Sequence, residues 1–199
     1  MAFAGLDDVP WAHLNHAYGS AADVPEQIRA LASGKDSAVE KAIWSLFGNI
    51  YHQGTVYSAS APAVPFLVEA LPMMAPKRQA ELLGLLASMA QGYGYYDVHR
   101  YLPFAKEAME KAWVDDPEAT LSAERSIVRD TTLAVFAQWG AIESCLNASA
   151  DRVRIAALHV LATLGQNDAS STPSADESLA YLGVRPPGSA PGEWANRVR

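Results

Sequence analysis

The chain has 199 residues, enough for one domain with a sizeable core, and half of them are hydrophobic while 19% are charged. A formal net charge of -7 argues against a broad electrostatic footprint on nucleic acid or anionic lipid. Because Cys145 is the single cysteine, the chain can form neither an intramolecular disulfide nor a zinc site of several cysteines. We expect Cys145 to be a small buried side chain on a helix, and the alternative is a reactive thiol. The N-terminus lacks a basic segment, and no apolar run approaches a membrane span, so we expect a cytoplasmic protein.

The first feature in chain order is a pair of histidines, His13 and His16, three residues apart. On a helix this spacing places both imidazoles on one face, but a metal site would need at least one further ligand. We therefore expect surface histidines on an N-terminal capping helix, which Trp11 anchors, and we predict no metal site.

Two helix pairs are predicted next. The first joins a short helix at 24–31 to a longer one at 39–50, whose apolar residues recur at the spacing of one helical face. The second joins 61–71, which has prolines in its opening turn, to 79–90, whose leucines follow the same pattern more loosely. Each pair has a short first helix and a longer second helix.

Two further pairs follow, 101–114 with 128–139 and 141–146 with 151–165. The apolar stripe of 151–165 has the same spacing as those of 128–139 and 39–50, with no gap inside any helix. A stripe that recurs along the chain indicates repeated helix pairs, each of which buries its apolar faces only by stacking on its neighbours.

The segment 151–165 resembles the second helix of a HEAT repeat, with its initial aspartate, Val-Arg step, central alanines and final Leu-Gly. Residues 20 to 165 resemble small bacterial HEAT-like proteins, above all where 48–57 runs into 61–71. The resemblance implies an all-α fold, a right-handed α-solenoid of about four helix pairs. The uneven repeat spacing implies at least one insertion.

The composition changes after residue 165, so we assign a solenoid domain to 1–165 and a Pro/Ser/Gly-rich tail to 166–199. The tail is either partly ordered over the last repeat or disordered, and its Trp194 is expected to dock on a surface. Charged neighbours are interpreted as ladders between the repeats, namely Glu124/Arg125, Arg129/Asp130 and Asp151/Arg154.

The first candidate site is the turn that contains His52, Gln53, Thr55 and Tyr57. We expect His52 and Gln53 to end a helix, whose negative partial charge favours a protonated imidazole. One interpretation is a corner that faces a ligand or a partner. The other is a structural turn, in which Gly54 caps the helix and Tyr57 packs inward.

The second candidate site is the segment with Tyr93, Tyr95, Tyr96, Asp97, His99, Arg100 and Tyr101, whose aromatic composition is typical of binding hot spots. The residues proposed to contact a partner or ligand there are Tyr95, Tyr96, His99 and Arg100. This insertion is expected to border the same surface as the His52 turn. Core packing of the tyrosines is the alternative. Asp97 and His99 are two residues apart, so on a helix they point away from each other, which argues against an acid–base pair.

The function that we predict is a non-catalytic protein-binding module that uses the concave face of the solenoid. Its acidic charge suits a basic partner, such as a toxin that it neutralises, and we expect a monomer or weak dimer without cofactor, nucleic acid or membrane partner. The alternative is an enzyme or small-molecule binder with a His/Tyr-lined pocket, by likeness to repeat proteins that attach bilin chromophores. A self-assembling structural element is a third hypothesis.

Overall fold

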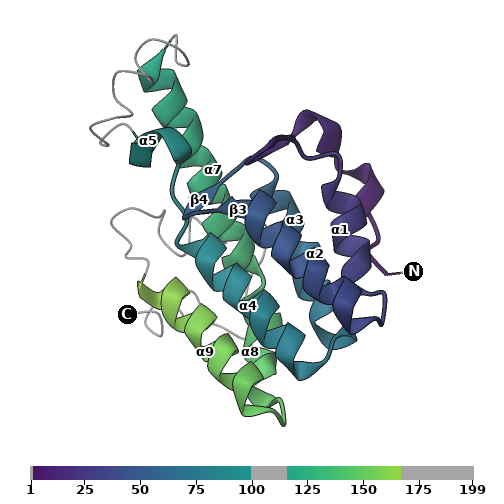
Figure 1. Cartoon of the computed structure of the whole chain (residues 1–199). Coiled ribbons are helices and arrows are strands. Elements are labelled where there is room, and N and C mark those ends of the chain that lie inside the picture. Colours follow the sequence, from purple (N-terminus) through teal and green to yellow (C-terminus); the bar gives the residue numbers. More distant parts are fainter. Residues whose placement is uncertain (1, 100–115, 167–199) are drawn as a thin grey trace.

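The computed structural model describes residues 2–99 and 116–166 (Figure 1). Arg100, the helix predicted at 101–114 and the tail from 167 onward lie outside these described residues. Within them α-helix predominates, so the coarse prediction of an all-α fold is confirmed.

The described helices form the bulk of the structure, and two short hairpins lie between them. The helices are α1 (Val24–Leu31), α2 (Asp36–Asn49), α3 (Ser60–Ala70), α4 (Pro76–Ala90), α5 (Tyr95–His99), α7 (Pro117–Ala137), α8 (Trp139–Ser144) and α9 (Asp151–Gln166). Single 3-10 turns are η1 (Leu6–Asp8), η2 (Trp11–His13), η3 (Leu71–Met73) and η4 (Cys145–Asn147). The hairpins are β1 (Asn15–His16) with β2 (Gly19–Ser20), and β3 (Tyr51–His52) with β4 (Thr55–Val56).

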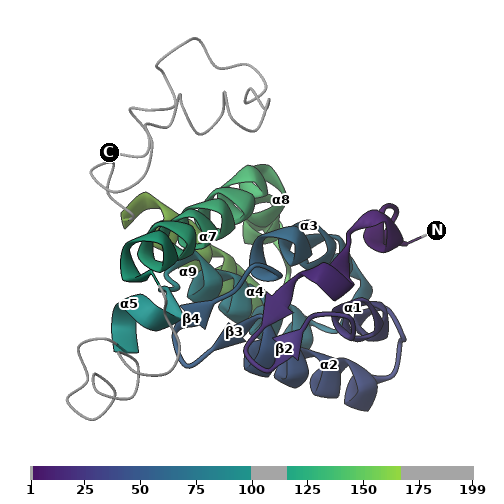
Figure 2. The same ribbon diagram turned by 90° about the horizontal axis from the view of Figure 1, so that it is seen from above.

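The helices lie in two layers (Figures 1 and 2). One layer contains α2, α4 and α9 side by side, and the other contains α1, α3 and α7. α1 packs on α2, and α7 packs mainly on α3. Most of the stripe predicted at 128–139 therefore lies in the layer of α1 and α3, in the second half of α7, which begins at Pro117. Its last residue, Trp139, begins α8.

The core forms where the predicted stripes meet. In α4, Leu82, Leu83 and Leu86 are fully buried, and in α9, Val153, Ala157 and Val160 are buried against α4. The stripes of α2 and α7 also face inward. Because the apolar spacing of each stripe matches one helical face, burial of that face drives the two layers together.

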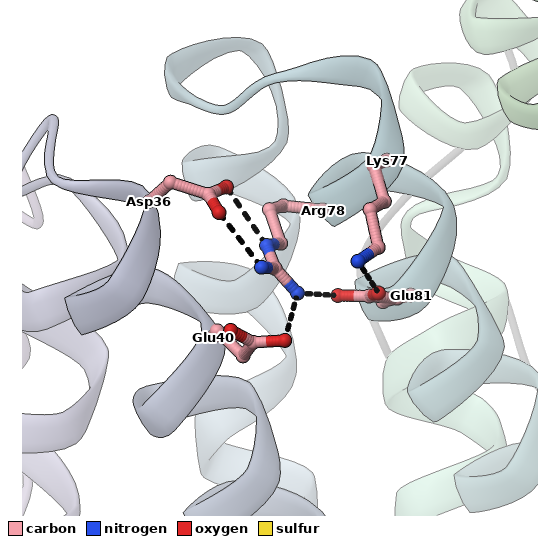
Figure 3. A network of polar contacts seen from close by, with 5 residues as sticks. All are labelled: Asp36, Glu40, Lys77, Arg78 and Glu81. Atoms are coloured by element: carbon pink, nitrogen blue, oxygen red, sulfur yellow. Dashed lines mark hydrogen bonds and ion pairs between the residues drawn. The ribbon is translucent and has the colours of Figure 1, made fainter.

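A buried arginine joins α2 to α4 (Figure 3). Arg78 is 3% exposed and donates from Nε and Nη2 to the two carboxylate oxygens of Asp36, at 2.9 and 2.8 Å. Its Nη1 donates to Glu40 at 2.9 Å and to Glu81 at 2.8 Å. These hydrogen bonds hold the pKa of the Asp36 carboxyl below its usual range.

The charged residues predicted to form ladders between repeats make local contacts in α7 and α9 and one contact to α5. Asp151 pairs with Arg154 one turn along the same helix, and Arg129 lies 3.6 Å from its own neighbour Asp130. Glu124 accepts hydrogen bonds from the backbone of α5. Neighbouring charges on one helix are close whatever packs against it, so adjacency in sequence gave no information on contacts between helices.

The predicted N-terminal capping helix is also wrong, although its anchor is buried. His13 ends a single 3-10 turn and His16 lies in β1, so the two histidines do not share a helical face. Trp11 is buried; its Nε1 donates to the carbonyl of Leu6 at 2.7 Å and its ring packs 6.5 Å from that of Phe66. Within residues 2–99 and 116–166, no helix combines the length and apolarity needed to cross a bilayer.

Candidate functional site

Two β-hairpins occupy equivalent places, each directly before a helix of the same layer. β1–β2 precedes α1 and β3–β4 precedes α3. In both hairpins a histidine is the last residue before a two-residue turn: His16 pairs with Gly19, and His52 pairs with Thr55. The prediction that His52 and Gln53 end a helix is therefore wrong, since α2 ends at Asn49.

The turn of the second hairpin has an unusual backbone conformation. Gln53 and Gly54 both have positive φ, at 50° and 96°. Two such residues make the type I′ turn, whose twist matches that of the flanking strands. Glycine adopts this conformation freely, whereas glutamine does so at a cost, so this turn carries backbone strain at Gln53.

Backbone hydrogen bonds join the hairpins and the segment after α4 into one edge of the molecule. Ala17 donates to the carbonyl of Asn49 at 3.0 Å, and Ala59 donates to that of Asn15 at 3.1 Å. Tyr93 donates to the carbonyl of Gly54 at 2.8 Å, and Val56 donates to that of Tyr93 at 3.0 Å. We name this edge the hairpin rim, with the side chains Tyr18, His52, Gln53, Tyr57, Tyr93, Tyr95 and His99.

Two glycines allow the segment after α4 to approach its neighbours. A Cβ on Gly92 would lie 2.4 Å from Cγ1 of Val56, and a Cβ on Gly94 would lie 2.3 Å from Oε2 of Glu124. Both distances are far below van der Waals contact. The glycines around Tyr93 therefore serve close packing.

Glu124 of α7 holds the first turn of α5. Its carboxylate accepts from the backbone N–H groups of Tyr96 at 2.7 Å and of Asp97 at 3.0 Å. The first N–H groups of any helix lack partners within it, and a carboxylate there also matches the helix dipole. α5 then carries Tyr95 and His99 one turn apart, with their rings stacked at 3.9 Å between centroids.

Thr55 and Tyr57 stabilise the turn from inside. Thr55 is 1% exposed, and its Oγ1 donates to the carbonyl of His52 at 2.7 Å. That hydroxyl has one proton, so at its second contact, 2.7 Å from Tyr57, it accepts the phenolic proton. Burial raises the pKa of Tyr57, an effect that the hydrogen bond to Thr55 partly offsets. Tyr57 is therefore a protonated structural donor at neutral pH.

Tyr18 and His52 link the two hairpin tips. Oη of Tyr18 lies 3.5 Å from Nδ1 of His52, and the rings meet edge-on with centroids 5.4 Å apart. Tyr18 is nevertheless 70% exposed and Tyr93 60% exposed. Two large aromatic side chains thus project from backbone that hydrogen bonds hold in place.

His16 has both ring nitrogens engaged. The backbone N–H of Tyr18 donates to Nδ1 at 3.0 Å, so the neutral ring carries its proton on Nε2, which lies 3.0 Å from the carboxylate of Asp23. Asp23 also accepts from Gln27 at 2.7 Å. Neither nitrogen of His16 is left to act as a base. In the described part of the chain, no three His, Cys, Asp or Glu side chains gather as a metal site requires.

The structure brings most of the predicted site residues to the hairpin rim. His52, Gln53, Tyr57, Tyr95 and His99 lie along it, whereas Thr55 is buried and Tyr96 contributes its backbone N–H to Glu124. Arg100 lies outside the described residues. Tyr93, which the sequence placed in the second candidate site, also lies on the rim. Sequence reasoning missed two residues of this site: Tyr18 and Glu124.

A usable signal for Tyr18 was present in the sequence. Residues 15–25 and 51–62 share a histidine, a short turn, small residues and a helix-opening proline, so the first segment could have been matched to the second. Nothing local marked Glu124, because its partners Tyr96 and Asp97 lie 28 and 27 residues away in the chain.

Cys145 is half-buried in η4, where its Sγ lies 3.6 Å from the carbonyl of Ala141. Burial raises the pKa of its thiol, which lowers the thiolate population that a reactive cysteine needs.

No protein-family model, curated protein or solved structure matches the chain. Inference about function therefore rests on the geometry described above.

Proposed function

We propose that the protein is a non-catalytic binding module, a HEAT-like solenoid of helix pairs that contacts a partner protein through the hairpin rim. The two-layer order of the described helices supports a solenoid, since paired helices stack in this way in such proteins. The proposal moves the contact surface from the concave face, predicted from sequence, to the edge where the hairpins project.

The observation that carries the proposal is the exposure of Tyr18 and Tyr93 on hydrogen-bonded turns. Tyrosine has only two side-chain torsions and a large amphipathic surface, so it gains contact area at a low entropic cost. Rigid backbone beneath it lowers that cost further. Tyrosines beside glycines on fixed loops are the composition that antibody paratopes use.

The partner that we propose is a basic protein. The chain's net charge of -7 would accelerate encounter with a positively charged surface and disfavour acidic competitors. A toxin neutralised by this module would belong to that class. This step rests on charge and on fold-level analogy.

The test is quantitative capture with a rim variant and a matched control. Wild-type protein, a Tyr18→Ser/Tyr93→Ser variant and a Leu158→Ser variant would be used as bait in native lysate, with bound proteins measured by mass spectrometry. Leu158 is a suitable control because it is an exposed apolar residue on α9. We expect a stoichiometric basic partner that the rim variant loses and the control keeps.

Calorimetry with the purified partner then gives the magnitude. Truncation of two hot-spot tyrosines should weaken binding by about 10-fold or more. A partner retained by the rim variant and lost by Leu158→Ser would place the interface on α9 and refute the proposal.

The alternative is a lyase-like enzyme or small-molecule binder with a His/Tyr-lined site. One observation favours it: the phenol of Tyr18 lies 3.5 Å from the imidazole of His52, which is close enough for proton exchange after a small shift. If His52→Ala and His99→Ala abolish binding of a small molecule while protein capture is unchanged, this alternative replaces the first.

A further inference from the structure

An exposed tryptophan lies in the middle of α2, away from the hairpin rim. Trp44 is 80% exposed, the most exposed of the large hydrophobic side chains in the described residues. A lone exposed apolar residue is ordinary, but an indole is costly to leave in water and is strongly enriched at binding hot spots. The surroundings of Trp44 therefore decide what it is suited to bind.

Trp44 follows Glu40 by one helical turn. Residues four apart on a helix are surface neighbours, and long helical side chains lean toward the N-terminal turn. An indole at this place is therefore expected to lean toward the turn that carries Glu40 and Lys41. Glu40 in turn belongs to the arginine cluster between α2 and α4, with Asp36 and Glu81 (Figure 3).

The carboxylates of this cluster are fixed before any partner arrives. Arg78 lies beneath them and binds Asp36, Glu40 and Glu81 at 2.8–2.9 Å, while the carboxylates remain accessible to solvent. The other cation drawn in Figure 3, Lys77, lies 3.9 Å from Glu81 and is itself exposed. Within the cluster three carboxylates face two cations, and the exposed Lys41 next to Glu40 offsets the remaining charge. What this surface presents to a cation is therefore the Glu40 carboxylate itself, which Arg78 holds in place.

We propose that Trp44 and the Glu40 carboxylate form a second docking site, which takes an arginine or lysine side chain of a partner protein. The cation would lie over the indole face and make an ion pair with Glu40. Cation–π contact and a preoriented carboxylate act in the same direction, because both require a positive group at the same place. This site does not depend on the hairpin rim.

Lys41 is the charge that opposes this docking. It precedes Trp44 by three residues and is exposed, so it is a surface neighbour of Trp44 as Glu40 is. A guanidinium over the indole would be repelled by Lys41. Its removal should therefore strengthen binding, an effect opposite in sign to that of removing Glu40.

The test uses a capped hexa-arginine peptide and a capped hexa-glutamine peptide, titrated into the full chain. Binding is followed by the indole N–H resonance of Trp44, assigned from its loss in Trp44→Ala. We expect the arginine peptide to shift this resonance saturably and the glutamine peptide to leave it unmoved. Glu40→Gln should weaken binding about 3-fold, and Lys41→Gln should strengthen it about 2-fold. Glu26→Gln, an exposed carboxylate on α1, is the matched control and should change nothing.

Two results would overturn the proposal. One is arginine-peptide affinity that Trp44→Ala and Glu40→Gln leave unchanged. The other is sedimentation of the wild type as a dimer that Trp44→Ala dissociates, which would make this face a contact between copies. The Tyr18→Ser/Tyr93→Ser variant should bind the peptide normally, so failure of the rim and failure of this site are distinguishable.

Discussion

The contact between Gly92 and Val56 gives the sharpest test of how the hairpin rim is held together. With alanine in place of Gly92, the added Cβ would lie 2.4 Å from Cγ1 and 3.2 Å from Cγ2 of Val56, and 3.2 Å from the carbonyl oxygen of Met89. The first distance demands a shift of the whole β4 strand or of the Val56 side chain. Val56 is 4% exposed, so its side chain has little room to rotate.

The expected effect of Gly92→Ala is a balance of two opposed contributions. Overpacking of a buried site costs about 1–3 kcal/mol. Replacing glycine by alanine also lowers the conformational entropy of the unfolded chain, which stabilises the folded protein by about 0.4–1 kcal/mol. We therefore expect a net destabilisation of about 1–2 kcal/mol. Val56→Ala alone removes two buried methyl groups and should cost about 2 kcal/mol.

The double variant distinguishes a direct clash from independent effects. With alanine at residue 56, the atoms that a Cβ at residue 92 would strike are absent. The double variant should therefore be destabilised by about 1–2 kcal/mol less than the sum of the two single variants. The free energy of unfolding would be measured by urea titration with far-UV circular dichroism. Gly84→Ala is the matched control: its Cβ would meet nothing within 4 Å on α4, so it should stabilise by up to about 1 kcal/mol.

Strict additivity in the double variant, or a Gly92→Ala protein as stable as Gly84→Ala, would refute the reasoning. Either result would mean that β4 and the segment after α4 are not in contact as described. The rim would then lack the fixed backbone on which the proposed function depends.

Three further predictions concern the hairpin rim and the arginine cluster between α2 and α4. Gln53→Asn should stabilise by about 0.5 kcal/mol in the same urea titration, because asparagine tolerates the left-handed conformation better than glutamine; a loss of stability would show that the turn is not type I′. Glu124→Ala should remove hydrogen-exchange protection from the amides of Tyr96 and Asp97 while protection in α4 persists; unchanged protection of these two amides would contradict the role given to Glu124. The difference in unfolding free energy between wild type and Asp36→Asn should be largest near pH 7 and should shrink as the pH falls below 3.8, the ordinary pKa of aspartate. The reason is that the pKa of Asp36 is lower in the folded than in the unfolded protein, so protonation of this carboxylate removes its contribution to stability. A difference that stays constant down to pH 3 would exclude this linkage.

The helices were the part of the fold that sequence could predict. Apolar residues of α2, α4 and α9 recur within one helix, so their pattern is readable without knowledge of any partner. The boundaries of 151–165 agree with α9 to within one residue. The prediction for α7 was less complete, because its first turns pack little and carry a weaker apolar pattern.

The hairpins could not be predicted in the same way. Strands of two residues are too short to show alternation, and their stability comes from bonds to distant backbone, such as Ala59 to Asn15 and Tyr93 to Gly54. Gln53 gives no turn signal, since Asn or Gly is the usual first residue of a type I′ turn. The site residues stay a prediction; the sequence pointed to them because aromatic and histidine side chains cluster around 52–57 and 93–99, and backbone hydrogen bonds place these two segments side by side.

The arrangement of helices explains why the exposed tyrosines Tyr18, Tyr93 and Tyr95 lie at one end. A hairpin precedes α1 and another lies between the end of α2 and the start of α3, while the segment around Tyr93 follows α4, so all three turns emerge at the same edge of the two layers. The layers bury the apolar stripes of the helices and leave the hairpin tips free of packing constraints. Substitutions at the tips, such as Tyr18 or Tyr93, should therefore alter binding without loss of stability, whereas substitutions at Gly92 or Val56 should alter both. If substitutions at Tyr18 or Tyr93 weaken binding without lowering stability, the rim serves to contact a partner. If they lower stability as well, the rim serves only to cover the ends of the helices.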